Sequence, residues 1–394
     1  MSTINGRDSC IIAGIGETAF SRDSRRSELS LALEAIHKAV DDAGLEIQEI
    51  DGIISYSLDT TASPGYLALN LGIPSLSYWG ETDGGGGATC GVIAQATAAI
   101  GAGLARNVVV YRAMNGRSGR RLGQAWSHNP WVGGPDLDEY ALPFGVLAPV
   151  QLYALKAAEY IRRFGVTSEQ LGWIAVVTRA RANTNPFALM YGRPMSIADH
   201  QASPLVAAPL RLLDCCLETD NAAAVVVTAA TRHKDLPHKA ALIMAAEMAS
   251  APTAHGPAFY SPFEPDLTQT AAHHLAPRLY AAANVTPDDI DVAQLYDSFT
   301  ITVLSQLEAY GFCGRGDGGP FVDGGQRIDL NGDIPINTYG GQLSGGYVNG
   351  FSGILEGARQ IRGTSTNQIP GAELCLVTGG ALAITSGMIL GVSS

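Results

Sequence analysis

The chain has 394 residues, of which 46% are hydrophobic and only 16% are charged. This length and apolar content allow a large buried core and two or three domain-sized units. A formal net charge of −12 and the lack of a basic run argue against a surface that binds a nucleic-acid backbone, so we expect no nucleic-acid partner.

Short β-branched runs alternate with longer helical patterns along the chain, which is typical of an α/β fold. In the first part we expect strands at 9–15, 51–57, 107–111 and 222–228, with helices at 28–43, 86–104, 151–164 and 168–183. After residue 235 we expect strands at 240–246, 292–296, 373–377 and 382–390, with helices at 267–283, 298–310 and 353–362.

Residues 115–149 interrupt this alternation. The segment is rich in Gly, Pro, Trp and His and shows no clean periodicity. A loop of this length inside a compact domain is usually functional or disordered. Two interpretations stay open: a functional loop, and a surface excursion that packs on a neighbouring subunit.

A pattern near residue 43 recurs after a further 240 residues. Ala43-Gly-Leu, Ile50-Asp51 and Ser55-Tyr56 correspond to Ala283-Asn-Val, Ile290-Asp291 and Leu295-Tyr296. Each copy has the pattern of a helix end, a polar turn and a strand. The spacing is too long for a solenoid. It therefore predicts two similar halves, at residues 1–235 and 236–394.

The cysteines and the chain start exclude other classes. The six cysteines are Cys10, Cys90, Cys215, Cys216, Cys313 and Cys375, with no CxxC pair and no histidine cluster nearby. We therefore expect neither a metal site nor a disulfide framework in this chain. The N-terminus has no apolar signal core, and no apolar run reaches about 18 residues. We expect a soluble cytoplasmic protein without membrane insertion.

Four local motifs resemble blocks of the thiolase superfamily, in its sterol-carrier or lipid-transfer-protein type. They are GIGETAFSR at 14–22, NTNPFALM at 183–190, CCLETDNAAAVVVT at 215–228 and NTYGGQLSGGYVNGFSG at 337–353. Asn221 replaces a glycine in the third motif. The resemblance implies the α/β thiolase fold, in which two similar βαβαβαββ halves stack as a five-layer αβαβα arrangement, and it implies a homodimer core.

The nucleophile position of a thiolase is changed in this chain. Thiolases place an activated cysteine at the start of the long buried helix of the first half, where the helix N-terminus stabilises the thiolate. Counting back along that helix places this position at Gly86. Cys90 follows four residues later, one turn inside an apolar helix. It is either the nucleophile of a thiolase or acyltransferase, or a buried core cysteine.

Two histidine positions of the family are tyrosines here. Tyr347 stands where the GHP block has its catalytic histidine, and Tyr296 stands where the HDCF strand has its histidine. Val377 or Thr378 holds the place of the second acid/base cysteine. The tyrosines are either a redesigned acid/base pair or simple fillers of the histidine space.

This pattern resembles the thiolase-like aldolases of bacterial steroid side-chain degradation, which lack the catalytic cysteine. Members cleave a 17-hydroxy-steroid carboxyl-CoA by a retro-aldol reaction that releases a 17-ketosteroid and propionyl-CoA. They work with a small partner that has an OB fold and a zinc ribbon. The resemblance implies catalytic roles for Tyr296 and Tyr347, an acyl-CoA substrate, and no cofactor in this chain, with any zinc only in the partner. A non-catalytic acyl-CoA-binding or scaffolding subunit is the alternative from another class.

A retro-aldol cleavage requires two proton-transfer groups and an oxyanion site, but no nucleophile. Tyrosine has an unperturbed pKa near 10, so a tyrosine base needs a neighbour that lowers it. For the enolate oxygen we expect backbone donors around Gly346 and Gly380, and His128 is a candidate orienting group. Asp297 follows Tyr296 directly and should point the other way on a strand, so it is a doubtful direct partner.

A basic patch in the irregular loop is the candidate site for the CoA phosphates. It contains Arg120 and Arg121, and the alternative is a solvated loop. The glycine run that includes Gly86 lacks GxxxxGK[ST], so it does not indicate nucleoside triphosphate binding. The missing side chain at Gly86 also predicts extra space for a bulky acyl group.

Overall fold

The computed structural model describes residues 9–57, 61–119, 121, 142–251, 266–380 and 382–393. The strands are β1 (Cys10–Glu17), β2 (Gly52–Ser57), β3 (Tyr78–Asp83), β4 (Asn107–Asn115), β5 (Leu205–Ala207), β6 (Leu210–Arg211), β7 (Asp220–Ala229), β8 (Ala241–Ser250), β9 (Val292–Gln294), β10 (Leu374–Gly379) and β11 (Ile384–Val392). The helices are α1 (Glu28–Asp42), α2 (Pro64–Leu71), α3 (Gly91–Gly101), α5 (Pro149–Phe164), α6 (Ser168–Thr184), α7 (Ile197–Ala202), α8 (Ala272–Ala283), α9 (Thr300–Ala309), α10 (Gly318–Val322) and α11 (Phe351–Arg362).

The sheet repeats the same strand pattern on both sides of its centre. Nine strands follow the order β3-β2-β4-β7-β1-β8-β11-β10-β9. Outward from β1, two antiparallel pairings are followed by two parallel ones. Outward from β8, two antiparallel pairings are followed by the parallel pairing of β10 with β9. The two half-sheets join where β1 pairs with β8.

Among the described residues of the second half, no strand corresponds fully to β3. At that place a single parallel bridge joins Ala293 to Ile336. Pro335 precedes this bridge and has no N–H to donate to a ladder, which limits pairing there. The sheet therefore shows a duplicated pattern, while the boundary at residues 235 and 236 stays a prediction.

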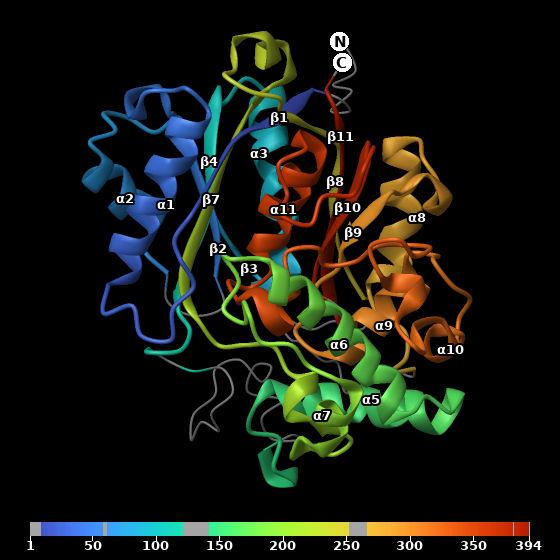
Figure 1. Cartoon of the computed structure of the whole chain (residues 1–394). Coiled ribbons are helices and arrows are strands. Elements are labelled where there is room, and N and C mark those ends of the chain that lie inside the picture. Colours follow the sequence, from blue (N-terminus) through green and yellow to red (C-terminus); the bar gives the residue numbers. More distant parts are fainter. Residues whose placement is uncertain are drawn as a thin grey trace.

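Helices and half-sheets stack in five layers (Figure 1). On one outer face, Ala35 of α1 packs in the same hydrophobic cluster as Val109 of β4. The next residue, Val110, belongs to the central cluster with α3 and α11, because successive strand residues face opposite sides. On the other outer face, Leu279 of α8 packs with Ile389 of β11. The predicted thiolase fold is confirmed, with α3 and α11 between the half-sheets.

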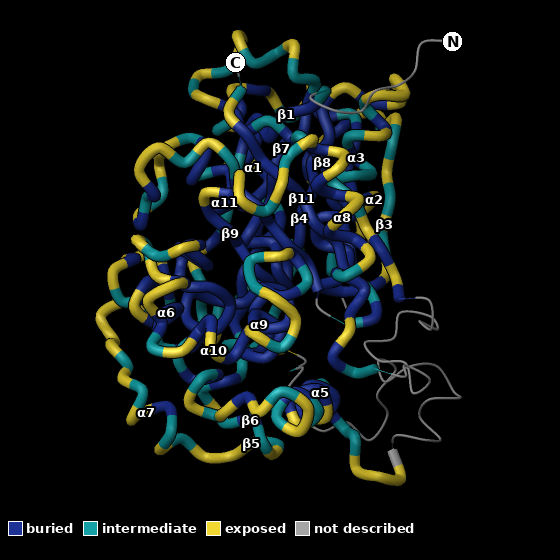
Figure 2. The backbone as a smooth tube through the Cα atoms, turned by 90° about the vertical axis from the view of Figure 1, so that its right-hand side faces the viewer, coloured by how far each residue is buried: buried dark blue, intermediate teal, exposed yellow. Residues whose placement is uncertain are grey.

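Burial follows these layers. Figure 2 shows a dark, buried centre and a more exposed region around α7 and the β5–β6 hairpin. No helix in the ranges described above is long and apolar enough to cross a membrane.

Most expected elements are present, and the deviations have local causes. The helix predicted at 86–104 is split into a 3-10 turn at Gly85–Ala88 and α3, because a run of glycines is a poor helix former. α5 begins two residues early, at Pro149, a residue that suits the first turn of a helix. α2 and β3 were not predicted. Most of the irregular segment 115–149 lies outside the described residues.

The close approach of β1 to α1 requires a glycine in the strand. A Cβ at Gly14 would lie 1.9 Å from the carbonyl oxygen of Ala39 and 2.8 Å from Cβ of Ala43. We expect Gly14→Ala to lower the free energy of unfolding by about 1–3 kcal/mol, because the helix must move away. Thermal denaturation measures this. The matched control is Gly65→Ala, since a Cβ at Gly65 meets nothing within 4 Å. An unchanged melting temperature for Gly14→Ala would contradict the tight contact.

Candidate active site

The two predicted catalytic tyrosines lie together in the structure. Tyr296 follows β9, and Tyr347 lies between the π-helical turn Gly341–Gly345 and α11. Each is only 6% exposed. Both hydroxyls donate to Oδ1 of Asn349, from Tyr347 at 2.9 Å and from Tyr296 at 3.3 Å. One buried amide oxygen therefore joins two residues that are 51 positions apart in the sequence.

Gly86, the position inferred for the lost nucleophile, lies against Tyr296. A Cβ at Gly86 would lie 2.3 Å from Oη and 2.4 Å from Cζ of Tyr296. No side chain fits there while the tyrosine ring keeps its place. The expectation that Gly86 leaves room for a bulky acyl group is therefore wrong at this point, because Tyr296 fills the space.

The backbone of Tyr296 is fixed on both sides. Its N–H donates to Oγ1 of Thr378 at 2.8 Å. Its carbonyl accepts from Nε2 of Gln306 at 2.7 Å, and Oγ1 of Thr302 lies 2.9 Å away. Thr378, near the place of the second thiolase cysteine, thus positions a tyrosine.

The backbone of Tyr347 is fixed by one residue from the first half. The N–H of Tyr347 donates to Oγ1 of Thr219 at 2.9 Å, and the same hydroxyl donates to the carbonyl of Tyr347 at 2.7 Å. Thr219 directly precedes β7 and is fully buried. The segment resembling the thiolase C…(S/T)DGAAA block therefore supports the tyrosine, a role that the sequence alone did not reveal.

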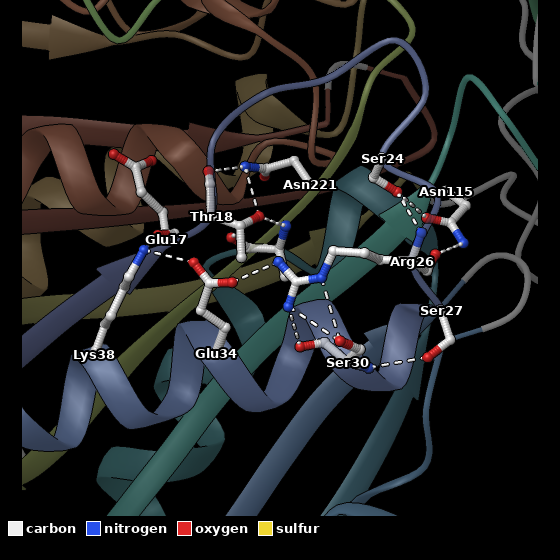
Figure 3. Close-up of polar contacts among 11 residues, drawn as sticks. Glu17, Thr18, Ser24, Arg26, Ser27, Ser30, Glu34, Lys38, Asn115 and Asn221 are labelled. Carbon is white, nitrogen blue, oxygen red and sulfur yellow. Dashed lines mark hydrogen bonds and ion pairs between the residues drawn. The ribbon is translucent and has the colours of Figure 1, made fainter.

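A polar network ties the chain that leaves β1 to β7, β4 and α1 (Figure 3). Nδ2 of Asn221 donates to the carbonyl of Thr18 at 2.7 Å, so the residue that replaces a family glycine ties β7 to the end of β1. Phe20 lies two residues after Thr18, and its ring covers Gly346, where a Cβ would lie 2.2 Å from Cδ1 of Phe20. The network thus fixes the backbone next to Tyr347.

Asn349 is held from the first half as well. Its carbonyl accepts from Oη of Tyr56 at 2.8 Å, and Oγ1 of Thr89 lies 2.9 Å away. Thr89 also lies 2.8 Å from the carbonyl of Gly86. Asn349 has a φ of +56°, a conformation that asparagine tolerates better than most residues. This side-chain cluster connects Gly86, Asn349 and both tyrosines.

The environment keeps Tyr296 protonated. Burial raises the pKa of Tyr296 well above its ordinary value of 10.0, and Tyr347, Tyr153 and Cys216 raise it further. Among the described residues no cation is among the main causes of this shift. Tyr296 therefore keeps its proton at neutral pH.

Asp297 lies beyond the end of β9, and its carboxylate bonds to the π-helical turn before Tyr347. Its carboxylate accepts from the backbone N–H of Gln342 at 2.8 Å and of Leu343 at 3.2 Å. Desolvation raises the pKa of Asp297 to about 7, although these hydrogen bonds oppose the shift. Asp297 thus fixes the turn before Tyr347 and is not a proton-transfer partner of Tyr296.

The other predicted site residues have different outcomes. The N–H of Gly346 donates to the carbonyl of Gly341 at 3.2 Å, so the turn already uses this expected oxyanion donor. Gly380 packs on Gly87, where a Cβ would lie 2.6 Å from Cα, and its oxyanion role stays a prediction. Arg121 forms an ion pair with Glu218, at 2.5 Å between Nη2 and Oε2, and its role in CoA binding is untested.

Two predicted residues, His128 and Arg120, lie outside the described residues. In the part of the chain that the structure describes, no group of three or more His, Cys, Asp or Glu side chains could hold a metal ion.

Cys90 lies at the N-terminus of α3 and not one turn inside a helix as predicted, but it does not have the surroundings of a nucleophile. It is fully buried, its N–H donates to Oγ of Ser386 at 2.9 Å, and Sγ lies 3.5 Å from the carbonyl of Val377. Burial raises the pKa of the Cys90 thiol to about 12. A reactive cysteine needs the opposite shift. The core interpretation of Cys90 is therefore favoured.

Sequence reasoning missed Asn349, Thr219, Thr89 and Tyr56. Asn349 had one signal, since it is an amide in an otherwise apolar and glycine-rich block at 345–353. Thr219 and Tyr56 had none, because their contacts join segments that are far apart in the chain.

The raised pKa of Asp297 predicts how stability depends on pH. The pKa of the Asp297 carboxyl rises from 3.8 to about 7 on folding, so the folded protein binds the carboxyl proton more tightly than the unfolded chain does. The resulting stabilisation is complete below about pH 4 and is lost as the pH rises through about 7. Asp297→Asn does not titrate. We therefore expect the difference in melting temperature, Asp297→Asn minus parent, to increase as the pH is raised from about 4 to about 7.

Differential scanning fluorimetry across this range measures the difference. A difference that stays constant with pH would show that Asp297 is ionised throughout and would contradict the shift.

Comparisons with known proteins show the family to which this chain belongs. Residues 260–392 match the thiolase C-terminal domain-like family. The chain is 44% identical over 394 residues to a steroid side-chain-cleaving aldolase of Thermomonospora curvata, covering 99% of each chain. It is 43% identical over 384 residues to the 17-hydroxy-3-oxo-4-pregnene-20-carboxyl-CoA lyase of Mycobacterium tuberculosis, covering 96% of this chain and 98% of the relative.

A solved structure described as the Ltp2-ChsH2(DUF35) aldolase superposes with a TM-score of 0.91 at 43% identity and 98% coverage of both chains. The chain belongs to the thiolase superfamily and, within it, to the family of the steroid side-chain-cleaving aldolases.

Proposed function

We propose that this chain is an acyl-CoA aldolase that cleaves a 17-hydroxy-steroid C22 carboxyl-CoA into a 17-ketosteroid and propionyl-CoA without a covalent intermediate. The observation that carries this proposal is the convergence of Tyr296 and Tyr347 on one amide oxygen, with Gly86 in place of a nucleophile. The 43–44% identity to aldolases over almost the whole chain supports the substrate class.

The reaction needs one proton acceptor and one proton donor. A base takes the proton of the β-hydroxyl, the Cα–Cβ bond breaks, and the hydroxyl carbon becomes a ketone. The bonding electron pair moves into the thioester as an enolate, and an acid then protonates Cα. The net result is the transfer of one proton from the hydroxyl to Cα, so no oxidant or cofactor is consumed.

The surroundings of the two tyrosines suggest how these roles are divided. Burial holds the pKa of Tyr296 well above its ordinary value, so Tyr296 starts protonated and serves as the donor to Cα. Tyr347 is then the acceptor of the hydroxyl proton, a role that it fills as the phenolate, after its own proton has left. Both hydroxyls meet at Oδ1 of Asn349, so the proton that Tyr347 takes up can return to Tyr296 once Tyr296 has protonated Cα.

Partner chains complete the proposal. The similar solved structure is described as the Ltp2-ChsH2(DUF35) aldolase, a name that joins two proteins. We place a small OB-fold and zinc-ribbon partner beside this chain as well, with any zinc in that partner. Strand β3 lies at an edge of the sheet and exposes Trp79 to 64%, which supports a homodimer formed through this edge.

The test of the reaction uses the purified chain alone and co-purified with a candidate partner. It is incubated with the 17-hydroxy-steroid carboxyl-CoA, and the 17-ketosteroid and propionyl-CoA are detected by mass spectrometry. Both products in equal amounts support the proposal. Tight binding of the acyl-CoA without turnover in either preparation would support a non-catalytic subunit instead.

Removing one hydroxyl should abolish proton transfer but preserve the fold. We expect Tyr347→Phe to lower kcat by roughly 10²–10⁴-fold, which is the usual contribution of general acid–base catalysis. Steady-state kinetics measures this. Tyr280→Phe is the control, because its hydroxyl donates to the carbonyl of Tyr310 at 2.9 Å, between α8 and the end of α9. A Tyr347→Phe enzyme with full activity would remove this residue from the mechanism.

A single methyl group at residue 86 should displace Tyr296. Gly86→Ala places Cβ where Oη of Tyr296 would be 2.3 Å away, so the ring must move. Because a misplacement of about 1 Å can cost about 100-fold in rate, we expect a loss of kcat of that order. Gly65→Ala is the matched control, since a Cβ at Gly65 would meet nothing within 4 Å. Equal kinetics for the two variants would contradict the proposed contact.

A further inference from the structure

Asn349 has a donor that no residue of the described chain uses. Its side chain is buried, at 2% exposure, and Nδ2 has no hydrogen-bond partner among the described residues. Oδ1, which is bonded to the same carbon, already accepts from both tyrosine hydroxyls. Nδ2 therefore lies beside the tyrosine pair.

An unsatisfied buried N–H costs free energy, and native structures contain few of them. The backbone of Asn349 is nevertheless held firmly, by the hydroxyls of Tyr56 and Thr89 at its carbonyl. A residue that is fixed at φ +56° and keeps one donor unpaired is well suited to bind a ligand atom.

We propose that Asn349 is a further functional residue of this site: its Oδ1 positions both tyrosine hydroxyls, and its Nδ2 donates to the thioester oxygen of the bound acyl-CoA. This inference deepens the proposed aldolase function and rests on it. The thioester oxygen becomes the enolate oxygen when the Cα–Cβ bond breaks. A preorganised donor aimed at developing negative charge stabilises the transition state more than the ground state.

The position of Nδ2 fits this oxygen. Tyr296 must reach Cα to protonate it, and the thioester carbonyl carbon is bonded to Cα. A donor next to the hydroxyl of Tyr296 therefore lies near the thioester oxygen of the same substrate. This donor matters because the N–H of Gly346, one of the expected oxyanion donors, is already bonded to the carbonyl of Gly341.

Two substitutions separate the two roles of the amide. Asn349→Gly removes both atoms and accepts a positive φ without strain. Asn349→Asp keeps an acceptor for the hydroxyls, tolerates the same φ, and loses the donor. The matched controls are Asn284→Gly and Asn284→Asp, because Asn284 has the same φ of +56° but lies exposed at the end of α8.

Kinetics of the complete enzyme, with its partner if one is required, is the first measurement. We expect both Asn349 variants to lose roughly 100-fold or more in kcat, the usual effect of removing one oxyanion donor. KM should change far less, because the oxygen gains its full charge only during the reaction. The Asn284 variants should match the parent enzyme, and melting temperatures show which variants are folded.

Hydrogen–deuterium exchange at Cα of propionyl-CoA is the second measurement. This exchange needs only enolate formation and no steroid. We expect the parent enzyme to catalyse the exchange in D₂O and both Asn349 variants to lose it by a similar factor.

The outcomes distinguish the two levels of the proposal. Folded Asn349 variants with the parent kcat and exchange rate would overturn the role of Asn349 while cleavage by the parent enzyme upholds the aldolase. Full activity of Asn349→Asp alone would overturn the donor role of Nδ2. A parent enzyme that neither cleaves the steroid thioester nor exchanges propionyl-CoA would refute the aldolase function, and the inference with it. Asn349→Asp keeps the donor role testable even if Asn349→Gly does not fold.

Discussion

One small volume between two distant segments can hold either a side chain at residue 86 or the ring of Tyr296, but not both. With Gly86, the hydroxyl of Tyr296 comes to 2.3 Å and its ring to 2.4 Å from where a Cβ would be. In a thiolase-like fold this exclusion links the loss of a nucleophile to the presence of a tyrosine. The proposed change from covalent attack to proton transfer therefore requires both positions to change together.

The residues around this volume come from both halves of the chain. Both tyrosines and Asn349 come from the second half, close to β9 and α11. The groups that hold their backbones include Thr219, Thr89 and Tyr56 from the first half. The central hydrophobic cluster joins both half-sheets through α3 and α11. The active-site geometry thus depends on how the halves pack, and neither half contains it alone.

The sequence predicted the elements whose pattern depends on local chemistry. Buried strands such as β7 and amphipathic helices such as α1 were found close to their true bounds. β3 was missed because its residues alternate between partly and fully exposed and include polar ones. The tyrosine pair was predicted from family positions, but its contact with Gly86 was not. Shape complementarity across such a sequence distance has no periodic signature, and the same holds for the hydroxyls that hold Asn349.

The pairing of β1 with β8 has a mechanical consequence. Only three residue pairs, centred on Ile11 and Leu242, connect the half-sheets along this seam. A slip or hinge motion at this seam would shift Thr219, Thr89 and Tyr56 of the first half relative to the two tyrosines of the second half. This shift would come before any exposure of the central core. A contact that stiffens or loosens the β1–β8 pairing can therefore change the rate of the reaction from a position far from the substrate.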